Sequence, residues 1–172
     1  MNQINRLAAA TRLPLEPIPR PPRVAVICSS WHSDIVDRCK ESLLAEFERN
    51  ALPASHVDVF QVPGAFEIPL HAQTLARTGR YQAIVACGLV VNGGIYRHEF
   101  VAATVIDALM RVQLDCEIPV LSAVLTPRNF HEHDDHRRFF TDHFEKKGIE
   151  VAQACLQTLT NYASLEAEGP PQ

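Results

Sequence analysis

Four short runs of consecutive apolar residues recur along the chain, and segments with helical periodicity separate them. The runs lie at Arg23–Cys28, Val57–Val62, Ala83–Val91 and Pro119–Leu125. Continuous apolar runs of this length are typical of strands buried on both faces of a sheet. Because helical patterns alternate with these strands, the sequence predicts βαβ units, a parallel sheet and an α/β fold.

The helical segments have recognisable ends. Ser33 or Asp34 can cap the helix that follows the first strand. The second helix ends at Gly79, which suits the position just past a helix C-terminus. The third begins near Tyr96, and helical patterns fill residues 130–163.

The two ends of the chain differ from this pattern. Residues 1–22 contain five prolines and predict a flexible, proline-rich arm. Residues 23–163 form a single domain, and residues 164–172 form a loose tail. A chain of 172 residues is of ordinary size for one domain with a core of its own.

Composition narrows the class of protein. A net charge of −4 argues against a protein that binds nucleic acid or anionic membranes in general. No apolar run approaches the length of a membrane span. We expect a cytoplasmic protein, because no secretory signal is evident and the cysteines are odd in number. Most of the five cysteines lie inside apolar runs. All five are expected to be reduced core residues: Cys28, Cys39, Cys87, Cys116 and Cys155.

The third strand is followed by the most informative stretch. It ends in Gly93 and Gly94, and Arg97, His98 and Glu99 follow within one helical turn. Glycines let the backbone approach an anion, and a helix N-terminus offers N–H groups and a positive dipole to phosphate. Taken alone, the stretch favours the simpler interpretation, a plain strand-to-helix turn with a charged first helical turn.

The other strand ends favour a ligand site, because the carboxyl ends of parallel strands meet at one rim. The only tryptophan, Trp31, follows the first strand between Ser30 and His32. A lone tryptophan is commonly a core residue, but here stacking on a planar ring competes with that interpretation. Glu67 lies in an apolar segment at a helix start; it is either a carboxylate stabilised by the helix dipole or an acceptor for ligand hydroxyl or amine groups.

A histidine-rich run raises the question of a metal site. It contains His131, His133, His136 and His143 among charged residues. Metal sites use a few ligands at fixed spacing, whereas this run has the character of a solvated helical face. We therefore predict no metal.

Two motifs identify a family. Val-Pro-Gly-Ala-Phe-Glu-Ile-Pro at Val62–Pro69, followed by Gly-Leu-Val-Val-Asn-Gly-Gly at Gly88–Gly94, closely resembles the 6,7-dimethyl-8-ribityllumazine synthases over Arg23–Leu159. The resemblance implies a flavodoxin-like three-layer fold with a four-stranded parallel sheet flanked by helices. It also implies riboflavin biosynthesis by condensation of 5-amino-6-(D-ribitylamino)uracil with 3,4-dihydroxy-2-butanone 4-phosphate, without metal or organic cofactor.

The resemblance also implies roles for single residues. Trp31 stands where the family usually has a phenylalanine that stacks on the pyrimidine ring. Ala65, Phe66 and Glu67 would hold the ribityl chain and the ring edge. Ser122 stands at a position that reaches a neighbouring subunit's pocket.

Further residues follow from the second motif. Leu89, Val90 and Val91 would line the ring pocket through their backbone. Gly94 and Ile95 would offer backbone N–H groups to the phosphate.

The sequence departs from the family at its proton-transferring histidine. Aligned without a gap, that position falls on Arg97, and Glu99 falls on the accompanying acidic residue; a shift of one residue would select His98. Arginine stays protonated near neutral pH and cannot act as a general base. The two side chains lie about 100° apart around a helix, so they cannot both face the same point.

The second departure concerns the phosphate-binding arginine. Arg137 or Arg138 is its candidate, with Lys147 as the matching lysine, in a region about three residues longer than usual. This pattern resembles the type II branch. In Thr141–Gly148, Phe144 and Glu145 either extend a helix or widen a kink.

The resemblance further implies a homo-oligomer of pentamers with active sites between subunits. The charged, enlarged segment favours a pentamer or a pair of pentamers over a closed shell. Because the histidine is missing, a flavin- or lumazine-binding paralogue with little or no activity is the alternative function. A generic flavodoxin-like signalling domain is disfavoured, because the rim is aromatic, glycine-rich and basic rather than acidic.

Overall fold

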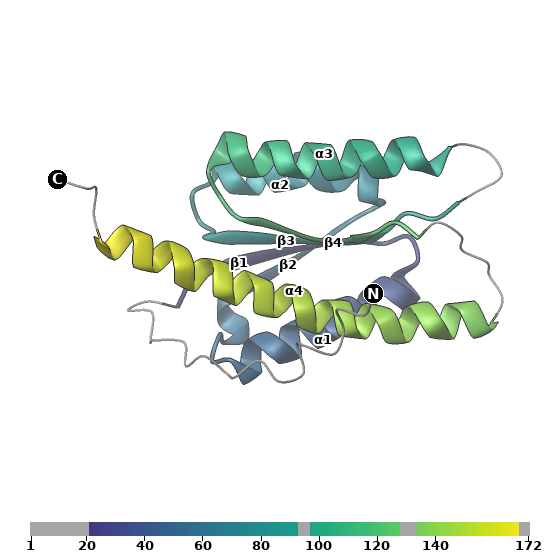
Figure 1. The fold of residues 1–172 in the computed structure, drawn as a ribbon, viewed down its shortest axis with the longest axis horizontal. Helices are drawn as coiled ribbons and strands as arrows, with labels where there is room; N and C mark the ends of the chain where they lie inside the picture. The colour runs from purple at the N-terminus through teal and green to yellow at the C-terminus, as the bar shows by residue number, and fades with distance from the viewer. Residues whose placement is uncertain (1–20, 93–96, 128–133, 169–172) are drawn as a thin grey trace, which may run out of the picture.

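Four parallel strands form the middle layer of the molecule. The computed structural model describes residues 21–92, 97–127 and 134–168, and within residues 134–137 it describes the backbone (Figure 1). The strands are β1 (Val24–Ser29), β2 (Val57–Val62), β3 (Ala83–Leu89) and β4 (Val120–Leu125), in the order β2-β1-β3-β4. This is the flavodoxin-like order, in which the chain reverses direction across the sheet between β1 and β3. The predicted α/β fold with three layers is therefore confirmed.

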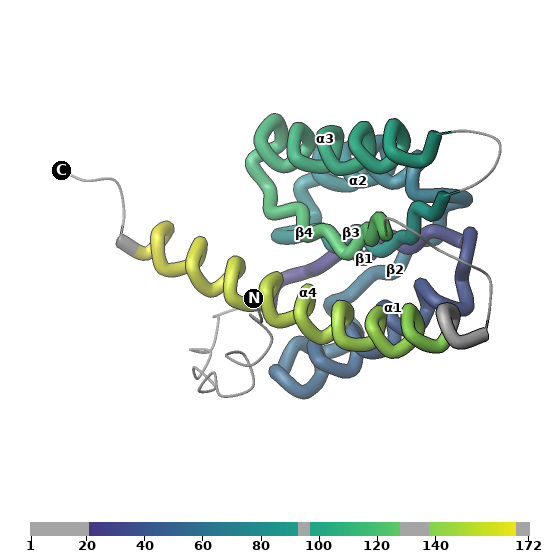
Figure 2. Tube along the Cα trace, turned by 45° about the vertical axis from the view of Figure 1, so that its right-hand side comes forward, coloured from purple at the N-terminus to yellow at the C-terminus, as the bar shows by residue number. Residues whose placement is uncertain are grey.

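Helices cover both faces of the sheet. Helices α1 (Ser33–Arg49) and α4 (Asp134–Glu168) lie on one face, and α2 (Ile68–Arg77) and α3 (His98–Cys116) lie on the other (Figures 1 and 2). Two short 3-10 turns, Ala54–His56 and Ala65–Glu67, precede β2 and α2. None of the helices in the described ranges is long and apolar enough to cross a membrane.

The central strands are buried because each face of the sheet has its own hydrophobic core. Val24, Val26 and Cys28 of β1 enter the core beneath α1 and α4, whereas Ala25 and Ile27 enter the core beneath α2 and α3. Alternation of this kind follows from the two-residue repeat of a strand. All of β1 and β3 is buried, as the continuous apolar runs predict.

The cysteines are free thiols. Four of them are buried, and Cys116 is half-buried. The Sγ atoms of Cys39 and Cys87 lie 3.8 Å apart in the core beneath α1. Burial raises the pKa of the Cys155 thiol to about 12. The prediction of core cysteines is thus confirmed for the four buried ones, whereas Cys116 lies only at the margin of the core.

One predicted helix cap is wrong and another is confirmed. The N-cap of α1 is His32, in the left-handed region with φ 56°, and no side chain forms a capping hydrogen bond there. The left-handed turn brings the chain into the helix directly after the rim, so Ser33 and Asp34 already lie within the first turn. Gly79 follows α2 with φ +66°, the conformation expected beyond a helix C-terminus.

Helix α4 is one continuous element from Asp134 to Glu168. Its continuity confirms that Phe144 and Glu145 extend a helix. The Phe144 side chain is fully buried in the core on the α1 side of the sheet. The helix also runs past residue 163, so residues 164–168 are helical rather than loose. Figure 1 shows this last part extending beyond the sheet. The predicted arm of residues 1–22 lies almost wholly outside the described residues.

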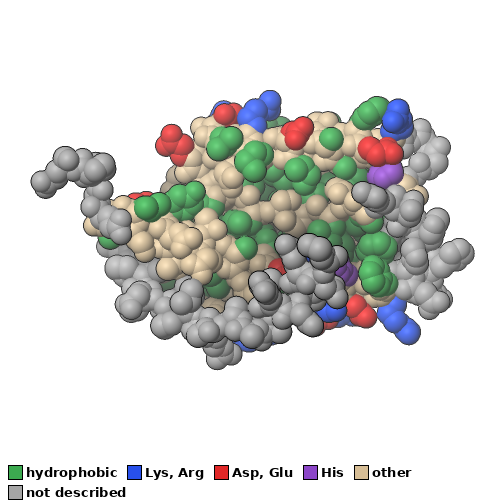
Figure 3. Space-filling view, viewed as in Figure 1, with side chains coloured by type: hydrophobic (Ala, Val, Ile, Leu, Met, Phe, Trp, Pro, Cys, Tyr) green, Lys and Arg blue, Asp and Glu red, His purple; other side chains and the backbone are tan. Residues whose placement is uncertain are grey.

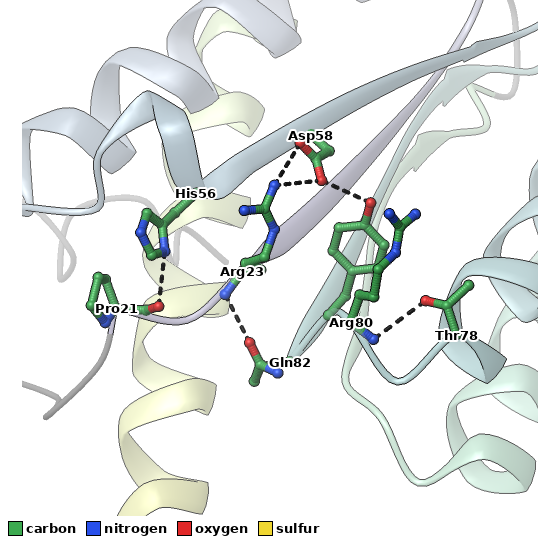
Figure 4. Close-up of polar contacts among 8 residues, drawn as sticks. Pro21, Arg23, His56, Asp58, Thr78, Arg80 and Gln82 are labelled. Carbon is green, nitrogen blue, oxygen red and sulfur yellow. Dashed lines mark hydrogen bonds and ion pairs between the residues drawn. The ribbon is translucent and has the colours of Figure 1, made fainter.

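A polar network ties the amino-terminal ends of the strands together (Figure 4). The Arg23 guanidinium donates to both carboxylate oxygens of Asp58, at 2.9 and 2.8 Å, and the Tyr81 hydroxyl donates to the same carboxylate at 2.8 Å. These hydrogen bonds lower the pKa of the Asp58 carboxyl. The network joins β1, β2 and β3 at the rim opposite the glycine-rich motifs.

Candidate functional site

Backbone hydrogen bonds hold the segments after β1 and β2 side by side. The Ser30 N–H donates to Val62 O at 2.8 Å, and the Trp31 N–H donates to Pro63 O at 3.0 Å. The Trp31 side chain is 60% exposed. Within this chain Trp31 is therefore not a core residue; its ring is exposed at the carboxyl-end rim of the sheet, and its stacking on a ligand stays a prediction.

The Val62–Pro69 motif at the end of β2 forms a tight turn into α2. The Gly64 N–H donates to Glu67 Oε2 at 2.8 Å, so the carboxylate closes its own turn. Ala65 is buried, whereas Phe66 and Glu67 are exposed. Glu67 therefore stabilises the helix start as a local residue, and its exposed carboxylate remains at the rim.

The end of β3 lies beside the end of β1, on the side away from β2. Leu89 and Val90 are buried and Val91 is half-buried. The Val90 N–H donates to Leu125 O at 2.9 Å, which continues the pairing with β4 by one residue. Gly94 and Ile95, predicted to bind phosphate, lie outside the described residues.

Arg97 and His98 take different positions at the start of α3. Arg97 is the N-cap residue and is exposed, with its Cζ atom 4.5 Å from the centre of the Phe100 ring. The His98 side chain is only 14% exposed, and its Nδ1 lies 3.5 Å from Oε2 of Glu99. The expected separation of about 100° around a helix does not apply, because Arg97 has an extended backbone (φ −81°, ψ 100°) and lies outside α3. The positively charged, outward group is Arg97.

The remaining predicted residues are spread over β4 and α4. Ser122 is exposed on the edge strand β4. Arg138 is exposed, and Lys147 donates from Nζ to Glu150 within the same helix. The side chain of Arg137 lies outside the described part. Among the described residues, Ser122, Arg138 and Lys147 form no hydrogen bond or ion pair with Trp31 or Glu67.

The histidine-rich run is described only in part. His131 and His133 lie outside the described residues, as does the side chain of His136. His143 stacks on Phe139, with ring centroids 6.0 Å apart and an interplanar angle of 8°. In the portions of the chain that are described, no group of three or more His, Cys, Asp or Glu side chains could hold a metal ion.

Two features of the rim escape sequence analysis. Gly64 lies directly against the Trp31 ring. Ser29, the last residue of β1, is buried with its Oγ unpartnered among the described residues. Neither is visible in a single sequence, because both depend on how two strand ends pack together.

The reversal of strand order between β1 and β3, with an exposed aromatic ring and a carboxylate at the carboxyl ends, defines an α/β protein of the flavodoxin-like kind. The family model of 6,7-dimethyl-8-ribityllumazine synthase matches residues 21–163. The chain belongs to this family, as its two motifs predict.

Individual relatives agree with the family match. The chain is 58% identical to 6,7-dimethyl-8-ribityllumazine synthase 2 of Bradyrhizobium diazoefficiens over 149 residues, covering 87% of this chain and 89% of the relative. It is 57% identical to 6,7-dimethyl-8-ribityllumazine synthase of Rhodococcus erythropolis, covering 83% and 92%. It is 54% identical to 6,7-dimethyl-8-ribityllumazine synthase 2 of Pseudomonas syringae pv. tomato, covering 83% and 84%.

Proposed function

We propose that this protein is a 6,7-dimethyl-8-ribityllumazine synthase of riboflavin biosynthesis. It condenses 5-amino-6-(D-ribitylamino)uracil with 3,4-dihydroxy-2-butanone 4-phosphate and releases phosphate and water. The observation that carries the proposal is the exposed Trp31 ring beside the Gly64–Glu67 turn at the ligand rim, in a chain more than half identical to enzymes of that name.

We assign the binding of the pyrimidine substrate to residues at the ends of β1, β2 and β3. Trp31 stacks on the pyrimidine ring, and the backbone of Leu89–Val91 borders it. Ala65, Phe66 and Glu67 hold the ribityl chain, with the Glu67 carboxylate accepting hydrogen bonds from its hydroxyl groups. This assignment uses the exposure of Trp31 and of the Glu67 carboxylate, which a purely structural role does not require.

The phosphate substrate is bound by positive groups. We assign this role to the outward guanidinium of Arg97, with Gly94, Ile95, Arg138 or Arg137, and Lys147 completing the phosphate site. Guanidinium groups suit phosphate because their N–H donors match its oxygens in pairs. Arg97 cannot accept a proton, so it orients the substrate rather than acting as a base.

The reaction then relies chiefly on orientation. The amine attacks the ketone and forms an imine, phosphate is eliminated, and the ring closes. Holding the two substrates side by side can supply most of the acceleration. Glu99, water and the released phosphate carry protons; a dedicated histidine base would add about 10²- to 10⁴-fold. We therefore expect an active enzyme that is slower than one with such a base.

Exposed apolar side chains support an oligomer. They lie along α2 and α3, and Figure 3 shows hydrophobic side chains between α3 and α4. A hollow of about 220 Å3 opens between α2 and α3 next to Phe66. The large exposed side chains on these two helices and the turn before α2 are Phe66, Leu70, Phe100, Ile106, Met110 and Leu114. Exposed apolar side chains that gather on one side of a protein commonly mark an interaction face.

The oligomer we propose is a pentamer or a pair of pentamers with active sites between subunits. The exposure of Ser122 on the edge strand β4 supports its proposed contribution to a neighbour's site. Light scattering should give five or ten times 19.2 kDa, about 96 or 192 kDa. A megadalton particle at neutral pH would contradict this assembly.

Buried free thiols suit a reducing compartment, and we place the protein in the cytoplasm.

The proposed reaction is tested by its stoichiometry. Incubation with both substrates should release one inorganic phosphate for each lumazine formed, and neither substrate alone should release phosphate at that rate. Phosphate release without lumazine formation would refute the proposed function.

A further inference from the structure

Gly64 has no side chain, and the Trp31 ring occupies the space in which one would lie. A Cβ atom placed on Gly64 would lie 2.7 Å from both Cε3 and Cζ3 of Trp31. Optimal contact between carbon atoms is about 3.5–4.0 Å. The indole therefore rests directly on the backbone of the turn, and any side chain at position 64 would displace it.

The backbone conformation of Gly64 does not itself require glycine. Its φ of −133° and ψ of 178° are extended, a conformation that every residue adopts. A Gly64→Ala substitution would consequently add a methyl group without backbone strain. What glycine provides at this position is space beneath the ring.

The main chain of Trp31 cannot retreat to make that space. Its N–H is bonded to Pro63 O at 3.0 Å, and the preceding Ser30 N–H is bonded to Val62 O. In addition, Ser29 pairs with Val62 in the β1–β2 register. An added methyl would therefore turn the ring about its side-chain bonds rather than move the backbone.

Glu67 is the second neighbour of this position, but it can adjust. The added Cβ would lie 3.1 Å from Glu67 Oε2, which is the end of a flexible and exposed side chain. The Gly64 N–H that holds this carboxylate would remain in an alanine variant. The perturbation thus acts first on Trp31.

We propose that Gly64 is a positioning residue for the ring stack: it sets the angle at which Trp31 presents its indole to the planar ligand. The proposal rests on the proposed function, because that function supplies the planar pyrimidine and lumazine rings. It also makes positions 31 and 64 a coupled pair. A phenyl ring has no atoms in the places of Cε3 and Cζ3, so Trp31→Phe removes the contact that constrains position 64.

The test is a double-mutant cycle on the full-length protein with wild type, Gly64→Ala, Trp31→Phe and the double variant. Binding of 6,7-dimethyl-8-ribityllumazine is measured by its own fluorescence. Gly64→Ala should weaken binding about tenfold, which corresponds to about 1.4 kcal/mol and lies within the range for aromatic stacking. In the Trp31→Phe background the same substitution should weaken binding less than about twofold, by the same argument.

Two further readouts separate positioning from general damage. The emission of the single tryptophan should shift in Gly64→Ala as the indole turns. In turnover assays the KM for the pyrimidine substrate should rise, while the KM for the phosphate substrate stays unchanged. If Gly64→Ala fails to fold, the double variant should recover folding, since it lacks the steric conflict.

Three results would overturn the inference: unchanged binding in Gly64→Ala, an equal loss in both backgrounds, or a double variant that remains unfolded while Trp31→Phe folds. A wild-type protein that binds lumazine but forms none would instead reject the proposed function. The coupling between Gly64 and Trp31 would then still be measured by the binding cycle.

Discussion

Gly148→Ala should destabilise the fold although it places a better helix former inside a helix. Gly148 is buried within α4, where this helix crosses α1. A Cβ atom there would overlap both Ser42 Oγ and the backbone carbonyl oxygen of Cys39, and would lie 3.0 Å from the Cys39 carbonyl carbon. A side chain can turn away, but the α1 backbone cannot, so the two helices would have to separate.

The expected magnitude is the difference of two effects. Alanine in a helix interior is favoured over glycine by about 1 kcal/mol. Overpacking a well-packed core typically costs about 1–3 kcal/mol, occasionally more. Because the overlap involves backbone, and because Phe144 nearby on α4 is fully buried, we place the packing cost at the upper end of that range. The net loss in unfolding free energy should be about 2 kcal/mol.

Denaturant unfolding followed by circular dichroism, at one fixed protein concentration, measures this difference. Ala154→Gly on the exposed side of α4 is the matched control and should cost about 1 kcal/mol from helix propensity alone. Adding Ser42→Ala to Gly148→Ala should recover only part of the loss, since the carbonyl overlap remains. A Gly148→Ala protein as stable as wild type would show that α1 and α4 are not in such close contact.

Three other predictions follow from the site and the opposite rim. Arg97→Ala should raise the KM for the phosphate substrate more than His98→Ala does; abolished turnover in His98→Ala with a mild Arg97→Ala would mean that His98 takes the catalytic position. Saturating lumazine or flavin should quench the emission of Trp31, and an unchanged spectrum would remove it from the site. The depressed pKa of Asp58 contributes stability above the ordinary carboxyl pKa of about 3.9 and loses it as the pH falls through the folded value. Stability measured from about pH 5 to pH 3 should therefore fall more in wild type than in Asp58→Asn; parallel curves would show that the ion pair with Arg23 contributes little.

The sheet was predictable chiefly because its central strands, β1 and β3, are buried on both faces. A strand such as β3 (Ala83–Leu89) is a continuous apolar run, and its end differs by only two residues from the predicted one. Residues that depend on several strands at once were not predictable. Asp58 and Tyr81 are far apart in sequence, and only the parallel register brings them to Arg23.

The same limit applies to the two glycines that control packing. Gly148 suggests a turn when the sequence is taken alone, because glycine commonly ends helices. In the structure it lies inside α4, where the nearby α1 backbone leaves no room for a side chain. Gly64 belongs to a recognised motif, but its contact with Trp31 depends on two loops meeting at the rim. Single-sequence patterns report burial and periodicity, not which backbones come close.

The assignment as an enzyme is tested most directly by a single-turnover experiment. Protein in excess over 5-amino-6-(D-ribitylamino)uracil is mixed with saturating 3,4-dihydroxy-2-butanone 4-phosphate, and lumazine absorbance is followed in time. We predict that lumazine forms well above the rate without protein, and that Trp31→Ala and Glu67→Gln reduce this rate. If ligand binding quenches the tryptophan while lumazine appears only at the uncatalysed rate, the protein is a lumazine-binding paralogue and not a synthase.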